Sequence, residues 1–184
     1  MCPMTATPLT IEWSLLGFLR QEPMHGYQIY QRLSKSQGMG LVWHLKQSQL
    51  YALLGKLERR EYVTYAIEQQ EGRPDRKVYE LTEAGRAALL AWVRTPVERG
   101  REFRMEFLAK LYFARQEGEQ IVAELLSEQR AACRGWLSEL ETEAAEHTDE
   151  DANEYAHLVY QFRIGQMEAV LAWIDLCEQT LLDH

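Results

Sequence analysis

Four consecutive side chains that can form hydrogen bonds, Lys-Gln-Ser-Gln at residues 46–49, open an amphipathic stretch that continues to residue 61. Its leucines follow the spacing of a helix with a single apolar stripe: Leu50, Leu53, Leu54 and Leu57. Glutamine can pair with an adenine edge, serine tolerates several partners, and lysine suits phosphates. One interpretation is a helix that enters a nucleic-acid groove; the other is an ordinary amphipathic helix with a solvated polar face. The predicted contacts are Lys46, Gln47, Ser48, Gln49, Tyr51 and Lys56.

A second group of cations follows in "EQQEGRPDRKVYELTEAG", residues 68–85. Arg73, Arg76 and Lys77 lie at and after a Gly-x-Pro turn, where they could hold a phosphate. Three acids in the same segment make residues 68–77 formally neutral. A phosphate-binding turn and a solvated hairpin with internal ion pairs therefore both remain open.

The charge of the chain is unevenly distributed. The net charge is -8, yet residues 1–95 hold 12 Lys and Arg against 9 Asp and Glu. Residues 96–184 hold 8 against 19, so the acidity belongs to the second half. The overall charge therefore does not exclude a polyanion as the partner of the first half.

The elements that must position these side chains are short helices and a hairpin. Thr10 caps a first predicted helix, Pro23 ends it, and a second helix follows Gly26 and ends at "KSQGMG". "EYVTYAI" and "RKVYEL" alternate as strands do, and Thr82 caps a further helix. Three helices followed by a two-stranded hairpin is the order of a winged helix-turn-helix. The backbone amides of residues 24–27, with His25 and Tyr27, are a further predicted phosphate contact.

The rest of the chain is helical by pattern. "RTPVERG" punctuates the chain where the charge balance changes sign, which predicts a domain boundary there. One helix is predicted over "REFRMEFLAKLYFAR", a longer one after Gly118, and a third after "HTDEDANE". The third is apolar on two faces, so part of it is expected to meet another chain. The predicted dimer-interface residues are Phe103, Phe107, Leu111, Tyr155, Phe162 and Trp173.

No set of residues predicts catalysis. Glu154 and His157 form a single Glu-x-x-His, whereas a di-iron bundle needs two such pairs and two more carboxylates. Cys133 and Cys177 lie in apolar helical stretches and indicate small core residues. We therefore expect no enzyme activity, no metal and no cofactor. No signal peptide and no membrane-length apolar run is found, so a cytoplasmic location is expected.

Three stretches carry a family resemblance: "MHGYQIYQRL", "QLYALLGKLERREYV" and "GRPDRKVYELTEAGRAAL". They resemble PadR-type transcriptional regulators, whose marks are His-Gly-Tyr before the second helix, Leu-Tyr in the third, and Tyr-x-Leu-Thr-x-x-Gly after the wing. The C-terminal half is similar to the longer helical domain of one branch. The resemblance implies a homodimer on a palindromic operator, usually a repressor, with some members sensing phenolic acids or drugs. Gln49 and Ala52 depart from the Thr and Pro of many relatives, so the operator is not implied.

The expected fold is mainly α with a small β-hairpin. A winged helix-turn-helix DNA-binding domain is predicted over residues 1–95, and an antiparallel, coiled-coil-like dimerisation domain over residues 96–184. The expected function is a cytoplasmic homodimeric regulator of transcription, a repressor that binds double-stranded DNA and responds to a small aromatic ligand near Trp92. The alternative is a winged-helix protein-interaction module with a coiled-coil arm and no DNA binding.

Overall fold

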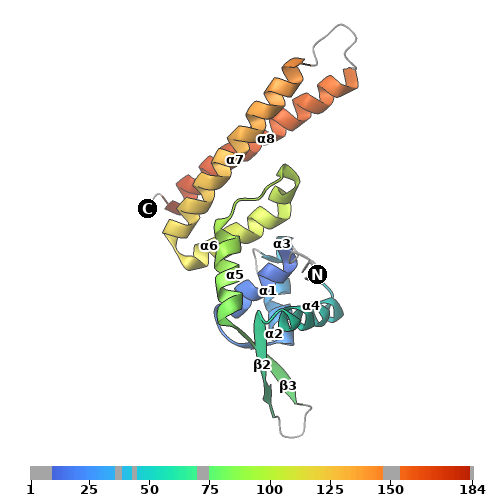
Figure 1. Cartoon of the computed structure of the whole chain (residues 1–184), viewed down its shortest axis with the longest axis vertical. Coiled ribbons are helices and arrows are strands. Elements are labelled where there is room, and N and C mark those ends of the chain that lie inside the picture. The colour runs from blue at the N-terminus through green and yellow to red at the C-terminus, as the bar shows by residue number, and fades with distance from the viewer. Residues whose placement is uncertain (1–9, 36–38, 43–44, 70–74, 147–153, 183–184) are drawn as a thin grey trace, which may run out of the picture. The chain divides into compact units, whose positions relative to one another are not determined.

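The computed structural model describes residues 10–35, 39–42, 45–69, 75–146 and 154–182. The chain divides into two compact units (Figure 1). The first holds residues 1–94 and 104–113, and the second holds residues 95–103 and 114–184. The first unit is thus discontinuous, because a segment beyond residue 95 packs with it.

The first unit is built around α1, Thr10–Leu19. Every side chain described in this helix is buried, as expected for a helix surrounded by others. Around it lie the other helices of the unit: α2 (Gly26–Lys35), α3 (Met39–Val42), α4 (Gln47–Arg59) and α5 (Glu83–Arg94). The predicted stripe of α4 faces this core, with Leu50, Leu54 and Leu57 fully buried. The short α3 is not predicted by the sequence, because two glycines nearby indicate only the end of α2.

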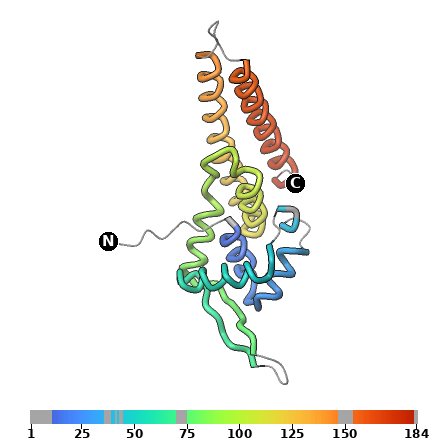
Figure 2. The backbone as a smooth tube through the Cα atoms, turned by 90° about the vertical axis from the view of Figure 1, so that its right-hand side faces the viewer, coloured from blue at the N-terminus to red at the C-terminus, as the bar shows by residue number. Residues whose placement is uncertain are grey.

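A small antiparallel sheet completes the first unit. The hairpin strands β2 (Val63–Glu68) and β3 (Arg76–Leu81) lie side by side (Figure 2) and pair antiparallel. Tyr65 lies opposite Tyr79 in this register. A two-residue strand, β1 (Met24–His25), adds to β3, so that the strand order is β1-β3-β2. The predicted winged helix-turn-helix is confirmed, with one strand more than the sequence indicates.

A tight junction connects the hairpin to α5. The Thr82 hydroxyl donates to the carbonyl of Glu61 at 2.7 Å and accepts from the Gly85 amide at 3.0 Å. A Cβ atom at Gly85 would lie 2.1 Å from the Tyr62 carbonyl oxygen. The backbone of α5 therefore approaches the segment before β2 so closely that only glycine fits.

The connection between α5 and the long helices is not the single helix that the sequence predicts. A 3-10 turn (Gly100–Glu102) and a π-helical segment (Phe103–Phe107) precede α6 (Leu108–Glu117). The Phe113 ring packs edge-on against Phe18, with ring centroids 5.5 Å apart. It lies where a Cβ of Gly17 would be, at 2.3 Å. These contacts with α1 place residues 104–113 in the first unit.

The second unit consists chiefly of two long helices, α7 (Glu119–Glu146) and α8 (Glu154–Leu182), side by side in Figures 1 and 2. Arg130, in the first half of α7, bonds Asp175 at 2.9 Å and Glu178 at 2.5 Å near the end of α8. The pair is therefore antiparallel, as predicted. Cys133 and Cys177 are buried, and burial raises the pKa of the Cys177 thiol to about 11.

The described ranges contain neither a helix that could cross a membrane nor a cluster of metal-binding side chains. No helix among them is both long and apolar enough to span a bilayer. No three His, Cys, Asp or Glu side chains in those ranges lie close enough together to hold a metal ion.

Candidate nucleic-acid interface

The N-terminus of α4 presents the polar side chains that are predicted to contact a groove. Lys46, Gln47, Ser48 and Gln49 are all exposed. Lys46 stands at the N-cap, and its amide donates to the Gln49 side-chain oxygen at 3.0 Å. That bond uses one of the two lone pairs of the Gln49 side-chain oxygen. Gln49 can therefore offer a base its amide nitrogen and the second lone pair of its oxygen. Gln47 and Ser48 lie in the first turn of α4, where a groove-binding helix reads bases.

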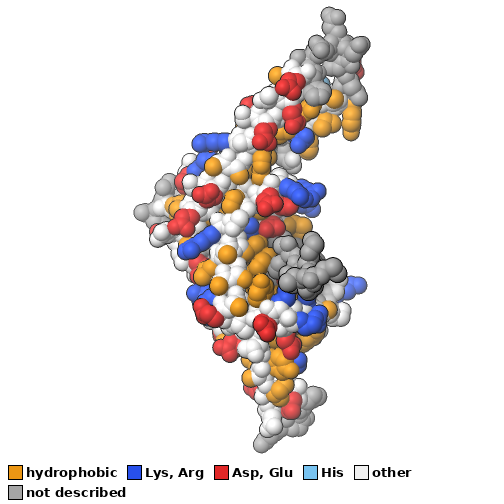
Figure 3. All heavy atoms as spheres, viewed as in Figure 1, with side chains coloured by type: hydrophobic (Ala, Val, Ile, Leu, Met, Phe, Trp, Pro, Cys, Tyr) orange, Lys and Arg blue, Asp and Glu red, His pale blue; other side chains and the backbone are white. Residues whose placement is uncertain are grey.

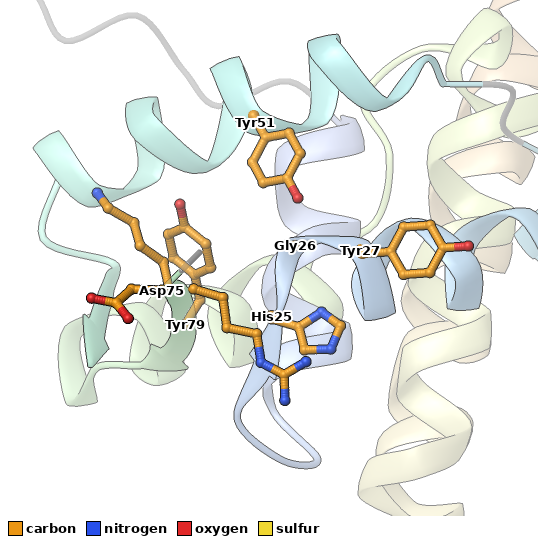
Figure 4. A pocket seen from close by; sticks show the side chains of 8 residues that line it. His25, Gly26, Tyr27, Tyr51, Asp75 and Tyr79 are labelled. Carbon is orange, nitrogen blue, oxygen red and sulfur yellow. The ribbon is translucent and has the colours of Figure 1, made fainter. Parts of the chain in front are cut away.

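Five of the predicted contact residues line one pocket of about 410 Å³. They come from four elements: His25 from β1, Tyr27 from the start of α2, Tyr51 from α4, and Arg76 and Lys77 from β3. Figure 4 shows His25, Tyr27 and Tyr51 around this pocket. We call this the wing pocket; its lining is completed by Gly26, Asp75 and Tyr79. The fold therefore brings together residues that lie more than 50 positions apart in the sequence.

The start of α2 is capped by His25. The Gln28 amide donates to Nδ1 of His25 at 3.2 Å, and the His25 amide donates to Oε1 of Gln28 at 3.0 Å. Partial burial, and then the charge of Arg76, lower the pKa of His25. The shift favours the neutral imidazole. Since Nδ1 accepts from the Gln28 amide, the neutral form carries its proton on Nε2, which can donate.

The two tyrosines of the wing pocket are both accessible. Tyr27 is 48% exposed and Tyr51 is 44% exposed. A Cβ at Gly26 would lie 2.4 Å from the Tyr51 ring, so the ring rests directly on the backbone of Gly26. This contact fixes the position of α4 against the start of α2. Each hydroxyl can donate to a phosphate oxygen.

The cations of the hairpin are paired within the chain but remain half-exposed. Arg76 Nε lies 2.7 Å from Oε2 of Glu68, and this hydrogen bond lowers the pKa of Glu68. Lys77 Nζ lies 3.6 Å from Glu58 Oε2 and 3.6 Å from the centre of the Tyr65 ring. The internal ion pairs expected of a solvated hairpin are therefore present. Exposed pairs of this kind are weak, so a phosphate can compete for the same cations. Arg73 lies outside the described residues.

Lys56 is oriented differently from the other predicted phosphate contacts. Its Nζ lies 2.6 Å from the carboxylate of Glu12, a residue of α1 that is fully buried. The structure thus gives the charge of Lys56 a partner inside the chain. Sequence reasoning missed Glu12, although an acid within the apolar run "TIEWSLLGFL" is itself a signal. It also missed Tyr79, which follows Lys77 by two residues on the same strand.

Trp92, the predicted effector residue, is buried and engaged. Its ring stacks on Trp13 with centroids 5.7 Å apart, and its Nε1 donates to Glu106 at 2.9 Å. A different pocket, of about 520 Å³, lies in the second unit and is here called the arm pocket. Its apolar lining residues are Trp136, Leu140 and Met167, surrounded by Glu98, Arg99, Gly100, Arg101, Glu139, Glu143, Arg163 and Gln166.

The predicted dimer-interface residues fall into two groups. Phe103, Phe107 and Leu111 are buried, and Phe103 packs edge-on against Trp173, which is itself partly buried. Tyr155 and Phe162 are 72% and 69% exposed. Together with Leu158 and Val159, which are exposed too, they follow i, i+3, i+4, i+7 spacing on α8, and we call this set the α8 patch. Figure 3 shows hydrophobic side chains gathered on this part of the arm.

The chain is similar to known regulators of transcription. Residues 15–91 match the transcriptional regulator PadR-like family, and residues 103–181 match a family described as virulence activator alpha C-term. The negative transcriptional regulator PadR of Bacillus subtilis is 25% identical over 179 residues, 90% of this chain and 97% of that protein.

Two solved structures of Bacillus subtilis PadR are also similar. The one in complex with operator DNA is 23% identical, covers 94% of this chain and 99% of that chain, and has a TM-score of 0.48. The one in complex with p-coumaric acid is 22% identical, with the same two coverages and a TM-score of 0.42.

Proposed function

Because this chain belongs to the PadR-like family of transcriptional regulators, we propose that it binds operator DNA as a homodimer and represses transcription. The observation that carries the proposal is the wing pocket, where five residues from β1, α2, α4 and β3 converge. The helix that supplies Tyr51 to this pocket also has an exposed first turn. The proposed activity is binding without catalysis, in the cytoplasm where the DNA lies.

The contacts divide by chemistry. Gln47 and Ser48 would meet base edges in the major groove, since they are exposed in the first turn of α4. The wing pocket would hold phosphates through Arg76, Lys77 and the two tyrosines. The first set gives specificity for sequence, whereas the second sets orientation and most of the affinity.

The proposal assigns DNA binding to residues 1–95 and dimerisation to residues 96–184. Two copies of α4 would enter successive major grooves roughly 34 Å apart, which favours a palindromic operator. The acidity of residues 96–184 supports this division, because 19 acids against 8 bases would repel DNA. We place the dimer interface at the α8 patch, whose apolar side chains are exposed in the single chain.

Salt dependence separates this function from the alternative, a winged-helix module that binds a protein. Contacts with phosphates predict a logarithm of affinity that falls linearly with the logarithm of salt concentration. Selection of bound duplexes from a random pool, followed by sequencing, is the direct test. A palindrome would identify the partner and the symmetry together, whereas no enrichment at low salt would contradict the proposal.

Removal of one wing cation should reduce the salt dependence. We expect Arg76→Ala to lower the slope by about one unit for each phosphate that the variant no longer binds, and to weaken binding to all sequences alike. Fluorescence anisotropy of a labelled duplex at several salt concentrations gives the slope. Arg86→Ala is the matched control, since Arg86 is a similarly exposed arginine beside an acid, on α5. If Arg76→Ala and Lys46→Ala both keep the wild-type slope, DNA is not the ligand of this surface.

A small aromatic effector is the second part of the proposal, and we place it in the arm pocket rather than at Trp92. The flat face of Trp92 is covered by Trp13, whereas the arm pocket has the size that small-molecule sites have. Its indole and arginines suit a planar acid. Residues 98–101, in the connection between α5 and α6, line it, so a ligand there would restrain that connection.

Loss of one lining arginine should weaken the binding of an aromatic acid. We expect Arg163→Ala to reduce the affinity for p-coumaric acid by about tenfold or more, the effect of one charge-assisted hydrogen bond. Titration calorimetry of the full chain measures it. Arg134→Ala, an exposed arginine of α7 that does not line the pocket, is the control. Equal losses in the two variants would remove the effector from this pocket.

A further inference from the structure

A buried ion-pair cluster joins the central helix of the first unit to the end of α4. Glu12 of α1 is fully buried. One of its carboxylate oxygens lies 2.6 Å from Nζ of Lys56, and the other lies 3.0 Å from NH1 of Arg60. Lys56 is in the last turn of α4 and Arg60 is its C-cap. A single carboxylate therefore holds α4 at two points near its C-terminal end.

Stability alone does not account for this cluster. Removing a carboxylate from water costs several kcal/mol, and its ion pairs commonly only offset that cost. A well-packed apolar side chain at the same place would stabilise the contact at least as well. The cluster also pairs two cations with an acid of the same unit, although the proposed ligand of that unit is a polyanion. Both features indicate that the cluster serves to fix the orientation of α4 rather than to stabilise the fold.

The rest of the contact between α4 and the core is apolar and therefore weakly directional. Leu50, Leu54 and Leu57 are fully buried, yet hydrophobic burial depends on area and would tolerate small rotations of the helix. The hydrogen bond from Arg60 to Glu12 depends on direction, and the ion pair with Lys56 adds a second point of attachment, so the two contacts together oppose such rotations. Gln47 lies nine residues before Lys56, about 13 Å along the helix. A small tilt of α4 about its contacts with Glu12 therefore displaces Gln47.

We propose that Glu12 is a positioning residue for sequence recognition: through Lys56 and Arg60 it fixes the tilt and rotation of α4, so that Gln47 and Ser48 meet base edges in register. The inference rests on the proposed function, because it assumes that α4 reads DNA. In this inference Lys56 belongs to the ion-pair cluster with Glu12 and Arg60, and phosphates are bound by the wing pocket.

The sign of the expected effect distinguishes positioning from electrostatics. Glu12→Gln removes a negative charge, so a purely electrostatic role predicts tighter binding to every duplex. Positioning predicts instead that the ratio of operator to non-specific affinity falls by about tenfold or more, the effect of misplaced base contacts. Glu83→Gln is the matched control, since it removes the same charge from a carboxylate that is 91% exposed.

Two measurements on the full chain test the inference. The first is the ratio of affinities for the selected operator and for a scrambled duplex at one salt concentration. The second is the orientation of α4 relative to α1 in the free protein, from residual dipolar couplings. We expect Glu12→Gln to lower the affinity ratio and to change the dipolar couplings of α4. Glu83→Gln should leave the ratio and the couplings unchanged. A folded Glu12→Gln variant with the wild-type ratio and wild-type couplings would overturn the inference.

A second variant covers the case in which Glu12→Gln does not fold. Glu12→Leu combined with Lys56→Met and Arg60→Met replaces the cluster by apolar side chains, a change that buried ion clusters commonly tolerate. A lower ratio in this variant supports the positioning role, and an unchanged ratio contradicts it, since the missing cations affect both duplexes alike. If the wild-type chain binds no duplex, the proposed function fails, while the couplings still decide whether Glu12 orients α4.

Discussion

Replacement of Gly85 by alanine is expected to destabilise the first unit by about 3 kcal/mol, because the added methyl group has nowhere to go. The new Cβ would lie 2.1 Å from the Tyr62 carbonyl oxygen and 2.9 Å from a Leu81 methyl carbon. The carbonyl cannot move away freely, since it accepts the Thr82 amide at 3.1 Å. Relief of the clash therefore breaks the junction between the hairpin and α5, which also holds the wing cations in place.

A second glycine provides the control. Gly135 lies in the middle of α7, and a Cβ built there meets nothing within 4 Å. Gly135→Ala should therefore stabilise the chain by about 0.5–1 kcal/mol through helix propensity. Urea unfolding followed by circular dichroism and tryptophan fluorescence measures both variants. Equal unfolding midpoints for Gly85→Ala and the wild type would show that the junction is not as rigid as described.

Introduction of a charge into the α8 patch is expected to dissociate the proposed dimer. Phe162 is 69% exposed in the single chain, as a residue that packs on a partner would be. In Phe162→Glu an interface would lose an aromatic anchor and bury an unpaired carboxylate, which should weaken dimerisation by about 2 kcal/mol or more. Operator affinity should fall with it, because one half-site binds far more weakly than two joined ones.

Sedimentation at micromolar concentration gives the assembly state directly. Gln179→Glu, which adds the same charge at an exposed position near the end of α8, should remain dimeric. A wild-type chain that sediments as a monomer would contradict the interface and the dimer together. A dimeric Phe162→Glu variant would contradict only the location.

The longer helices α1, α2, α4 and α5 of the first unit could be predicted because local pattern and final environment agree. Leu50, Leu54 and Leu57 of the predicted stripe are buried, and β2 and β3 pair as expected. The two-residue β1 could not be predicted, since its extended conformation depends on hydrogen bonding to β3, which is distant in sequence. The prediction of one regular helix through the π-helical Phe103–Phe107 is wrong, because apolar spacing alone does not record a local change of pitch.

The residues of the candidate site could be predicted from the sequence, but the directions in which their side chains point could not. The sequence indicates that Arg76, Lys77 and Tyr51 belong to one surface, and all three line the wing pocket. It could not show that Lys56 turns inward, because that depends on an acid 44 positions earlier that the fold brings within 2.6 Å. Side-chain direction at such a position is decided by tertiary partners, which leave no periodic signal.

The discontinuity of the first unit also bears on how such regulators can be recombined. Residues 104–113 belong with residues 1–94, and Phe113 fills the space beside Gly17 in α1. A chimera joined at residue 95 would therefore combine residues 1–94 of the first unit with the α6 of another protein. Part of the core of the first unit would then be exposed. The segment to transfer is therefore residues 1–113, which includes both parts of the first unit and the connection between them. An exchange of operator specificity between such proteins has to include residues 104–113 as well as residues 1–94.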